Sequence, residues 1–133
     1  MGYTITTTLP LPFPEAVNRV RAALSEQGFG VLTEIDVRRT FENKLGAEAA
    51  DAVGDYLILG ACNPKLAQRA LKADPQIGAL LPCNVVIRGA GTVGTSIVEA
   101  IDPQTMVQLT GSPEVQKVAD EAGTLLRAAL DSL

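Results

Sequence analysis

Five short segments rich in β-branched or other aliphatic residues recur along the chain, and they constrain its fold more than any other feature. They are residues 3–9, 29–37, 55–61, 84–87 and 95–101. Proline, glycine or polar residues bound the segments, a pattern that is typical of β-strands. Links of the hairpin type favour antiparallel neighbours, so we expect a mainly antiparallel sheet of about five strands.

Helical periodicity between these segments predicts what covers the sheet. One amphipathic helix is expected from Pro14 to a stop at Gly28, and a second from Asn63 and Pro64 to about residue 74. A long last helix is expected to open at Ser112, with an apolar stripe long enough to cross a sheet. The stripe is Val115, Val118, Ala119, Ala122, Leu125, Leu126, Ala129 and Leu130. The sequence therefore predicts an α+β fold in which helices pack on one face of the sheet.

The stretch from residue 38 to 54 is the least regular. Phe41 and Leu45 have helical spacing and predict a short helix, and the Ala-rich residues after Gly46 are expected to form an exposed loop. Just before it, Glu34 and Asp36 share the more polar face of a predicted strand. We interpret them as solvated carboxylates, and the alternative is a metal-binding pair.

Residues 89–94 read Gly-Ala-Gly-Thr-Val-Gly and match the glycine pattern of a dinucleotide-binding loop directly after a predicted strand. That pattern requires a helix after the glycines, whose first turn meets the pyrophosphate. Residues 95–98 are Thr-Ser-Ile-Val, which favour a strand. We therefore predict that the glycines form a turn between two antiparallel strands and bind no dinucleotide.

Length, charge and hydropathy limit the classes of partner that the protein can bind. The 133 residues suit a single domain over residues 1–133, and the formal net charge is −4 with no basic run longer than Arg38 and Arg39. We therefore expect no nucleic-acid partner. No stretch approaches the roughly 20 apolar residues of a membrane span. Because residues 1–5 also lack the order of a signal peptide, we expect a cytoplasmic protein with no membrane partner.

Histidine is absent from the sequence, which excludes Ser-His-Asp and Cys-His nucleophile systems and histidine-containing zinc sites. The two cysteines cannot complete a four-cysteine zinc site, and in a reducing cytoplasm we expect them to be thiols. The sequence thus contains no catalytic constellation, and it predicts no cofactor and no metal.

Two cysteine motifs carry a resemblance to a known family. Residues 60–64 read Gly-Ala-Cys-Asn-Pro, residues 77–87 contain Leu-Leu-Pro-Cys-Asn-Val-Val-Ile, and Ile-Asp-Pro follows at 101–103. With residues 36–37 and 44–46, the chain resembles the domain-of-unknown-function family 302 (DUF302), a group of small prokaryotic proteins. The resemblance implies a TATA-binding-protein-like (TBP-like) or Bet v 1-like fold, β-α-β(4)-α with an inserted helix, whose curved sheet cups a long helix. It implies no established activity.

The same motifs supply the candidate site residues. Cys62 and Asn63 end one predicted strand, and Cys83 and Asn84 begin the next. If these strands are antiparallel neighbours, the four side chains can form a polar cluster that binds an anion or a soft metal, or that cycles between thiol and disulfide. The other interpretation is that the cysteines are buried core residues and Asn63 an ordinary helix cap.

We predict that Cys62 and Cys83 lie near one another as reduced thiols. Cys62 is expected to be the more reactive, because a helix begins beside it at Asn63 and the positive end of a helix favours an anion. Cys83 precedes a predicted buried strand and has no such help.

Three classes of function remain. The first is a binding module for a small molecule, with an aliphatic groove between the sheet and the C-terminal helix. The second is a thiol-based redox or soft-metal-handling protein that uses Cys62 and Cys83. The third is a structural or interaction subunit with a large apolar surface buried between chains. Because a small sheet leaves its edges open, we also expect a homodimer.

Overall fold

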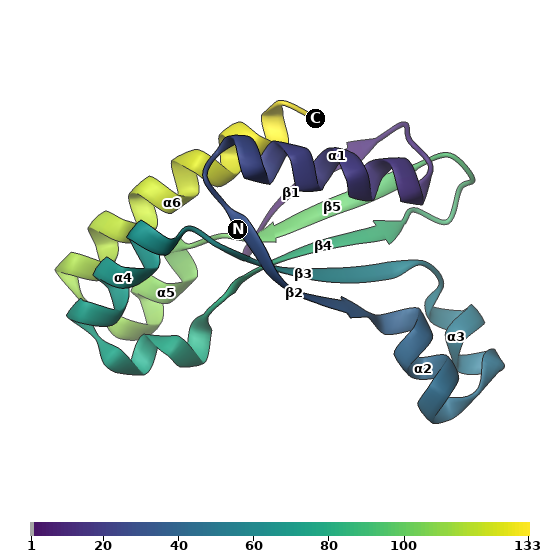
Figure 1. Cartoon of the computed structure of the whole chain (residues 1–133), viewed down its shortest axis with the longest axis horizontal. Helices are drawn as coiled ribbons and strands as arrows, with labels where there is room; N and C mark the ends of the chain where they lie inside the picture. Colours follow the sequence, from purple (N-terminus) through teal and green to yellow (C-terminus); the bar gives the residue numbers. More distant parts are fainter. Residues whose placement is uncertain (1) are drawn as a thin grey trace.

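A five-stranded antiparallel sheet forms the centre of the computed structural model, which describes residues 2–133 (Figure 1). The strands are β1 (Thr4–Leu9), β2 (Gly30–Asp36), β3 (Tyr56–Cys62), β4 (Cys83–Gly89) and β5 (Ser96–Ile101). Their order across the sheet is β1-β5-β4-β3-β2, and every neighbouring pair is antiparallel. The predicted α+β class and antiparallel sheet are confirmed, and β1 and β2 are the two edges.

Residues 2–133 also form six α-helices and one 3₁₀-helix, of which the last two follow the final strand. They are α1 (Phe13–Glu26), α2 (Val37–Leu45), α3 (Ala47–Val53), α4 (Pro64–Ala73), η1 (Pro75–Leu80, the 3₁₀-helix), α5 (Gln104–Thr110) and α6 (Pro113–Asp131). In Figure 1, α1 and α6 lie over one face of the sheet, α4 and α5 lie beside α6 at one end, and α2 and α3 project from the opposite end. The long C-terminal helix predicted from the apolar stripe is present as α6.

The core divides into two clusters that α6 joins. The first lies between α1, the covered face of the sheet and the C-terminal half of α6, where Leu24, Leu59 and Leu126 are fully buried. The second lies between α4, η1, α5 and the N-terminal half of α6, and includes Ile77 and Val115. Only half of the stripe on α6 therefore packs against the sheet region. The other half forms a separate core that holds α4 and α5.

Two helices are absent from the sequence prediction. Residues 47–53 were expected to be an exposed loop, and that expectation is wrong, because they form α3. Gly46 adopts a φ of +98°, which reverses the chain without the strain that a Cβ would add, and alanine is the strongest helix former. The second helix is α5, a short helix that buries Met106 and ends at Gly111 in a left-handed conformation. Val37, expected to end a strand, instead begins α2.

The glycine-rich segment forms a turn, as predicted. Strands β4 and β5 are antiparallel neighbours, and the Ala90 N–H donates to the Thr95 carbonyl at 3.2 Å across the link. Gly91 and Gly94 have φ values of +81° and +83°, which favour glycine. Strand β5 then begins at Ser96, where a dinucleotide-binding loop requires the first turn of a helix.

The uncovered face of the sheet combines apolar side chains with one ion pair. Ile35, Ile58 and Val86 lie in one row across β2, β3 and β4, and Arg88 Nε donates to Glu99 Oε1 at 2.6 Å between β4 and β5. No helix among residues 2–133 is long and apolar enough to cross a membrane.

Candidate functional site

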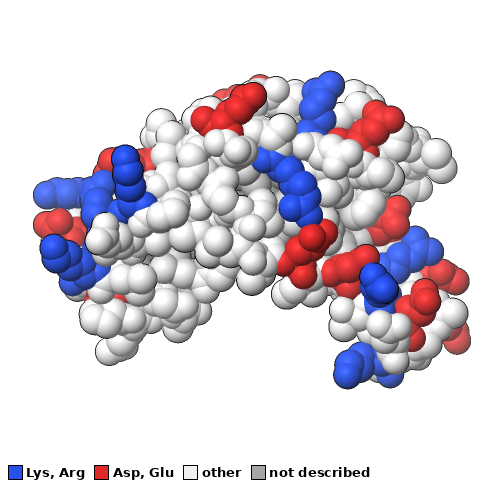
Figure 2. Space-filling model, viewed as in Figure 1, with Lys and Arg blue, Asp and Glu red and all other residues white. Residues whose placement is uncertain are grey.

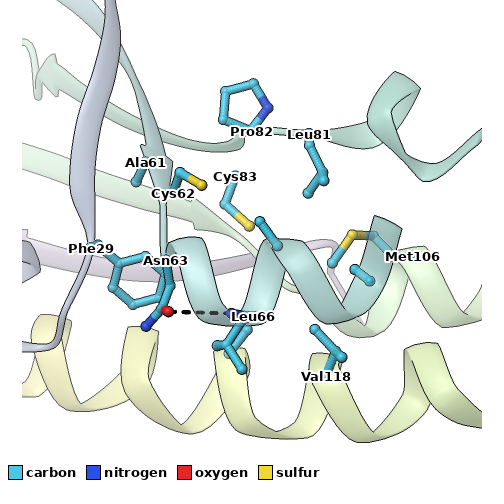
Figure 3. A pocket seen from close by; sticks show the side chains of 13 residues that line it. Phe29, Ala61, Cys62, Asn63, Leu66, Leu81, Pro82, Cys83, Met106 and Val118 are labelled. Carbon is cyan, nitrogen blue, oxygen red and sulfur yellow. Dashed lines mark hydrogen bonds between the residues drawn. The ribbon is translucent and has the colours of Figure 1, made fainter. Parts of the chain in front are cut away.

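A pocket lies where β3 ends and β4 begins, beneath α4 and against the N-terminal half of α6 (Figure 3). Its cavity volume is about 40 Å³. The walls are mainly apolar and include Phe29, Leu66, Leu81, Pro82, Met106, Val118 and Ala122. Cys62, Asn63 and Cys83 also line the pocket. The pocket is therefore an apolar cavity with sulfur atoms and one carboxamide at the end nearest the sheet.

Local sequence explains why the chain leaves the sheet at this point. Asn63 follows the last residue of β3, and its Oδ1 accepts a hydrogen bond from the Leu66 N–H at 3.4 Å. Pro64 takes the first helical position, where a missing N–H does no harm. The helix that starts here turns Leu66 and Ala70 toward α6, and both are buried. The Cys-Asn-Pro motif is thus a helix start that also forms one wall of the pocket.

Gly60 links the two cysteine motifs. A Cβ atom at Gly60 would clash with Thr33 Oγ1 and would lie 2.7 Å from Pro82 Cγ. Glycine is therefore required for the ring of Pro82 to approach β3. Because Pro82 directly precedes Cys83, this close approach helps to fix where β4 begins beside β3.

The two thiols face one pocket from neighbouring strands. Ala61 is the register partner of Cys83, so Cys62 lies one residue beyond the position directly opposite Cys83. Figure 3 shows both sulfur atoms directed toward the pocket. Both cysteines are free thiols; Cys62 is half-buried, whereas Cys83 is 8% exposed. The predicted proximity of Cys62 and Cys83 is therefore observed.

Burial changes the chemistry of Cys83. The apolar surroundings penalise the thiolate and raise the pKa of Cys83 from its ordinary value of 9.0 to about 11, and the nearby Cys62 adds to the rise. Cys83 is consequently a neutral thiol at neutral pH. Any ligand that binds the Cys83 sulfur as a thiolate must displace its proton.

Asn84, the fourth candidate residue, lies elsewhere. It is exposed and pairs in register with Gly60, whereas Cys83 and Val85 on either side of it are buried. Adjacent residues in a strand point to opposite faces, so Asn84 lies on the uncovered face of the sheet. The structure thus brings three of the four candidate residues to the pocket and places the fourth behind it.

Several pocket residues escaped the sequence reasoning. Val118 belonged to the predicted stripe of α6, but nothing in the sequence indicated that it would meet the cysteines. Met106 lies on α5, a helix without a clear apolar period, and Phe29 lies just before the edge strand β2. All three are buried side chains, and only the tertiary structure shows that they are buried beside the cysteines.

The carboxylates of β2 have structural partners. Glu34 forms an ion pair with Arg21 of α1 at 2.8 Å, and Asp36 Oδ1 accepts from the Arg39 N–H at 3.0 Å as the N-cap of α2. Within residues 2–133, no three His, Cys, Asp or Glu side chains are grouped to hold a metal ion. These contacts account for both carboxylates without a ligand.

The chain is similar to one protein family and to solved structures. The model of a family described as "Domain of unknown function DUF302" matches residues 5–133. One matching solved structure is the uncharacterized conserved protein DUF302 from Bacillus stearothermophilus, which is 27% identical, with a TM-score of 0.86 and 98% of each chain covered. No curated protein matches the chain.

Proposed function

The chain belongs to the DUF302 family of domains of unknown function, and from its pocket we propose that it is a binding module for a small ligand. The observation that carries the proposal is the apolar cavity between the sheet and α6, with Cys62, Asn63 and Cys83 at one end. Apolar walls with a few convergent polar groups are characteristic of ligand sites. The lining contains no carboxylate, amine or imidazole, so it is suited to binding and not to proton transfer.

The volume of the cavity limits the ligand. It measures about 40 Å³, whereas sites for drug-sized molecules measure roughly 300–1,000 Å³. A space for one water requires at least about 10–15 Å³ on the same kind of measure. The proposed ligand is therefore an ion, a very small molecule, or the tip of a larger molecule that remains outside the pocket.

Native mass spectrometry of gently purified protein tests this function. We expect the wild-type chain to carry an added mass, and Ala67→Leu to lose it, because Ala67 lines the pocket and a larger side chain there fills the space. Gln68→Leu is the matched control, since Gln68 is the exposed neighbour on α4. A wild-type chain without added mass, or equal retention by Ala67→Leu, contradicts the proposal.

A second candidate function is thiol–disulfide exchange, favoured by the shared orientation of Cys62 and Cys83. The rise along a strand and the spacing between strands put their Cα atoms about 6 Å apart. A disulfide also requires the two side chains to converge, and both cysteines line the same pocket. Cys62 Sγ would attack a low-molecular-weight disulfide and release one thiol. Cys83 Sγ would then attack Cys62 Sγ and release the second, so that two electrons pass to the small disulfide. The raised pKa of Cys83 slows that second step, which is why this function ranks second.

Labelling of the native protein with iodoacetamide tests the exchange function. Cys62 is half-buried and Cys83 is 8% exposed with a raised pKa, so we expect Cys62 to react first and Cys83 to react slowly. Peptide mass mapping at successive times measures the alkylation rate of each cysteine. Equal labelling, reversed labelling, or no labelling before unfolding would leave both cysteines as core residues.

We also propose that the protein pairs as a homodimer in the cytoplasm, where reduced thiols persist. Strand β2 is an edge of the sheet and carries Leu32 at 66% exposure and Ile35 at 49% exposure. An edge with unpaired backbone groups and apolar side chains favours a symmetric partner strand. Light scattering should give a dimer for the wild type and a monomer for Leu32→Lys, with Leu109→Lys on α5 as the exposed control. A wild-type monomer at micromolar concentration contradicts the pairing.

A further inference from the structure

Sulfur is the donor atom that the pocket collects from three separate elements. Cys62 ends β3, Cys83 begins β4, and Met106 reaches the pocket from α5 (Figure 3). The remaining polar side chain of the lining, Asn63, already accepts a hydrogen bond from the Leu66 N–H through its Oδ1. Thiolate and thioether ligands select soft cations, Cu(I) above all, over Mg²⁺ or Ca²⁺.

The number of donors further restricts the cation. Structural Zn²⁺ is almost always held by four ligands in a tetrahedron. The pocket offers two thiols and one thioether, and the described residues provide no group of three His, Cys, Asp or Glu that would extend the set. Such a set suits an ion that accepts two or three sulfur ligands. A cavity of about 40 Å³ accommodates a bare ion of this kind.

Charge also favours a cation at this position. Two thiolates within the mainly apolar walls would carry a charge of −2, which a bound cation partly neutralises. Binding Cu(I) forms two copper–sulfur bonds, sends two thiol protons to solvent, and changes the charge of the site from zero to −1. The N-terminal end of α4 begins at Pro64, next to Cys62 and Asn63, and its positive partial charge offsets that remaining charge.

We propose that the pocket binds one Cu(I) ion between Sγ of Cys62 and Sγ of Cys83. This inference rests on the proposed binding function and names its ligand. The wall around the two sulfurs is mainly apolar and includes the buried Leu66 and Val118, and an apolar shell of this kind limits the access of solvent to a bound ion.

Anaerobic titration of the full chain with Cu(I), in competition with the chromophoric chelator bicinchoninate, tests the proposal. We expect one copper per chain. Cys62→Ser and Cys83→Ser should each lower the affinity by more than about 100-fold, since the loss of a mere outer-shell partner can already reach that size. Circular dichroism confirms that each variant is folded. If Cys83→Ser does not fold, the affinity of Cys62→Ser still tests the proposal, because Cys62 is only half-buried and we expect that variant to fold.

Two further variants test the ligand set. Met106→Leu keeps the side-chain volume and removes the thioether, so it should lower the affinity less than either cysteine variant. Gln68→Leu, on the exposed side of α4, should bind copper as the wild type does. A larger loss in Met106→Leu than in Cys62→Ser overturns the two-thiolate site. Zn²⁺ bound as tightly as Cu(I), with the same dependence on both cysteines, overturns the choice of ion.

The outcomes separate this inference from the proposed function. If the wild type binds no Cu(I) but carries another mass that Ala67→Leu loses, the copper inference falls and the binding function stands. If copper binds equally to the wild type and Cys62→Ser, the copper is adventitious and the inference falls. If the wild type binds neither copper nor any other mass, both fall.

Discussion

Two helical excursions flank the central strand β3, and they are stabilised in different ways. The excursion that leads into β3 consists of α2 and α3; α2 has no buried residue, and α3 has one, Ala50. The excursion that leads out consists of α4 and η1, which bury Leu66, Ala70 and Ile77 against α6 and α5. In Figure 1 the first projects from one end of the sheet, and the second lies against the C-terminal helix at the other end.

The first excursion depends on local interactions. Asp36 caps α2, and the Arg38 guanidinium contacts Asp55 at 3.0 Å and Asp51 at 3.2 Å, which ties α2 to α3 and to the start of β3. Figure 2 shows acidic and basic side chains close together over this lobe. Surface ion pairs contribute little to global stability, so we infer that this lobe opens locally. The pocket lies at the opposite end, where packing holds Cys62 and Cys83 in place.

The largest expected contrast is between one aliphatic residue of each excursion. Ile77 in η1 is 1% exposed, and Ile77→Ala should lower the free energy of unfolding by about 2–5 kcal/mol through lost burial and a cavity. Leu45 in α2 is 68% exposed, and Leu45→Ala should change the free energy of unfolding by no more than about 0.5 kcal/mol. Urea denaturation measures both. Losses of equal size would show that the two excursions are equally integrated and would break the comparison.

A second contrast concerns the pH dependence of stability at the packed end. The pKa of Cys83 is raised from 9.0 to about 11 in the folded chain, chiefly by burial. Below pH 9 the thiol is protonated in both the folded and unfolded states. Between pH 9 and 11 the unfolded state loses the proton first, so stability falls as pH rises, by about 2–3 kcal/mol over the interval.

The control for this effect is Cys83→Ser, which does not titrate in the same range. The two proteins differ only at this position, so the difference between the two stability curves isolates the Cys83 thiol. The curves should converge by about 2–3 kcal/mol between pH 9 and 11. Parallel curves would show that Cys83 is solvated in the native state and that the pocket end is open.

The same contrast explains which parts of the fold the sequence predicts. The strands β3, β4 and β5 and the α6 stripe are periodic, because each buries one face, and their predictions are confirmed. The helix α3 has no stripe, since only Ala50 is buried, so its residues resemble a loop. The helix α5 is short and buries Met106 alone. A helix that does not bury one face has no periodic pattern of apolar residues, so its sequence does not reveal it.

The candidate site shows a similar division. Cys62, Asn63 and Cys83 come from the two motifs that carry the family resemblance, and all three line the pocket. Asn84 was grouped with them, although the alternation of a strand that begins at Cys83 turns it to the other face. Met106 could not be found, because it meets the cysteines only through the packing of α5 against α6.

The next contrast compares the N-caps of the two excursions. Asn63→Ala removes the hydrogen bond to the Leu66 N–H and should lower the free energy of unfolding by about 1 kcal/mol, because α4 is part of the packed core. Asp36→Ala removes the hydrogen bond to the Arg39 N–H, and we expect faster amide hydrogen exchange in α2 without a measurable change in global stability. Equal global losses would indicate that α2 unfolds only together with the whole chain.

The smallest expected effect is that of Arg38, whose side chain bridges Asp51 and Asp55. Both hydrogen-bonded carboxylates raise the pKa of this guanidinium, Asp55 more than Asp51, but the group is exposed and solvent screens the attraction. Arg38→Met should therefore leave the urea midpoint of the whole chain unchanged while amide exchange in α2 and α3 becomes faster. Lys44→Met is the matched control, because Lys44 lies on the same helix and the described residues give it no ion pair. If Arg38→Met lowers global stability as Ile77→Ala does, the lobe is part of the cooperative core. If it leaves amide exchange in both helices unchanged, the ion pairs do not hold the lobe together and its stability has another source.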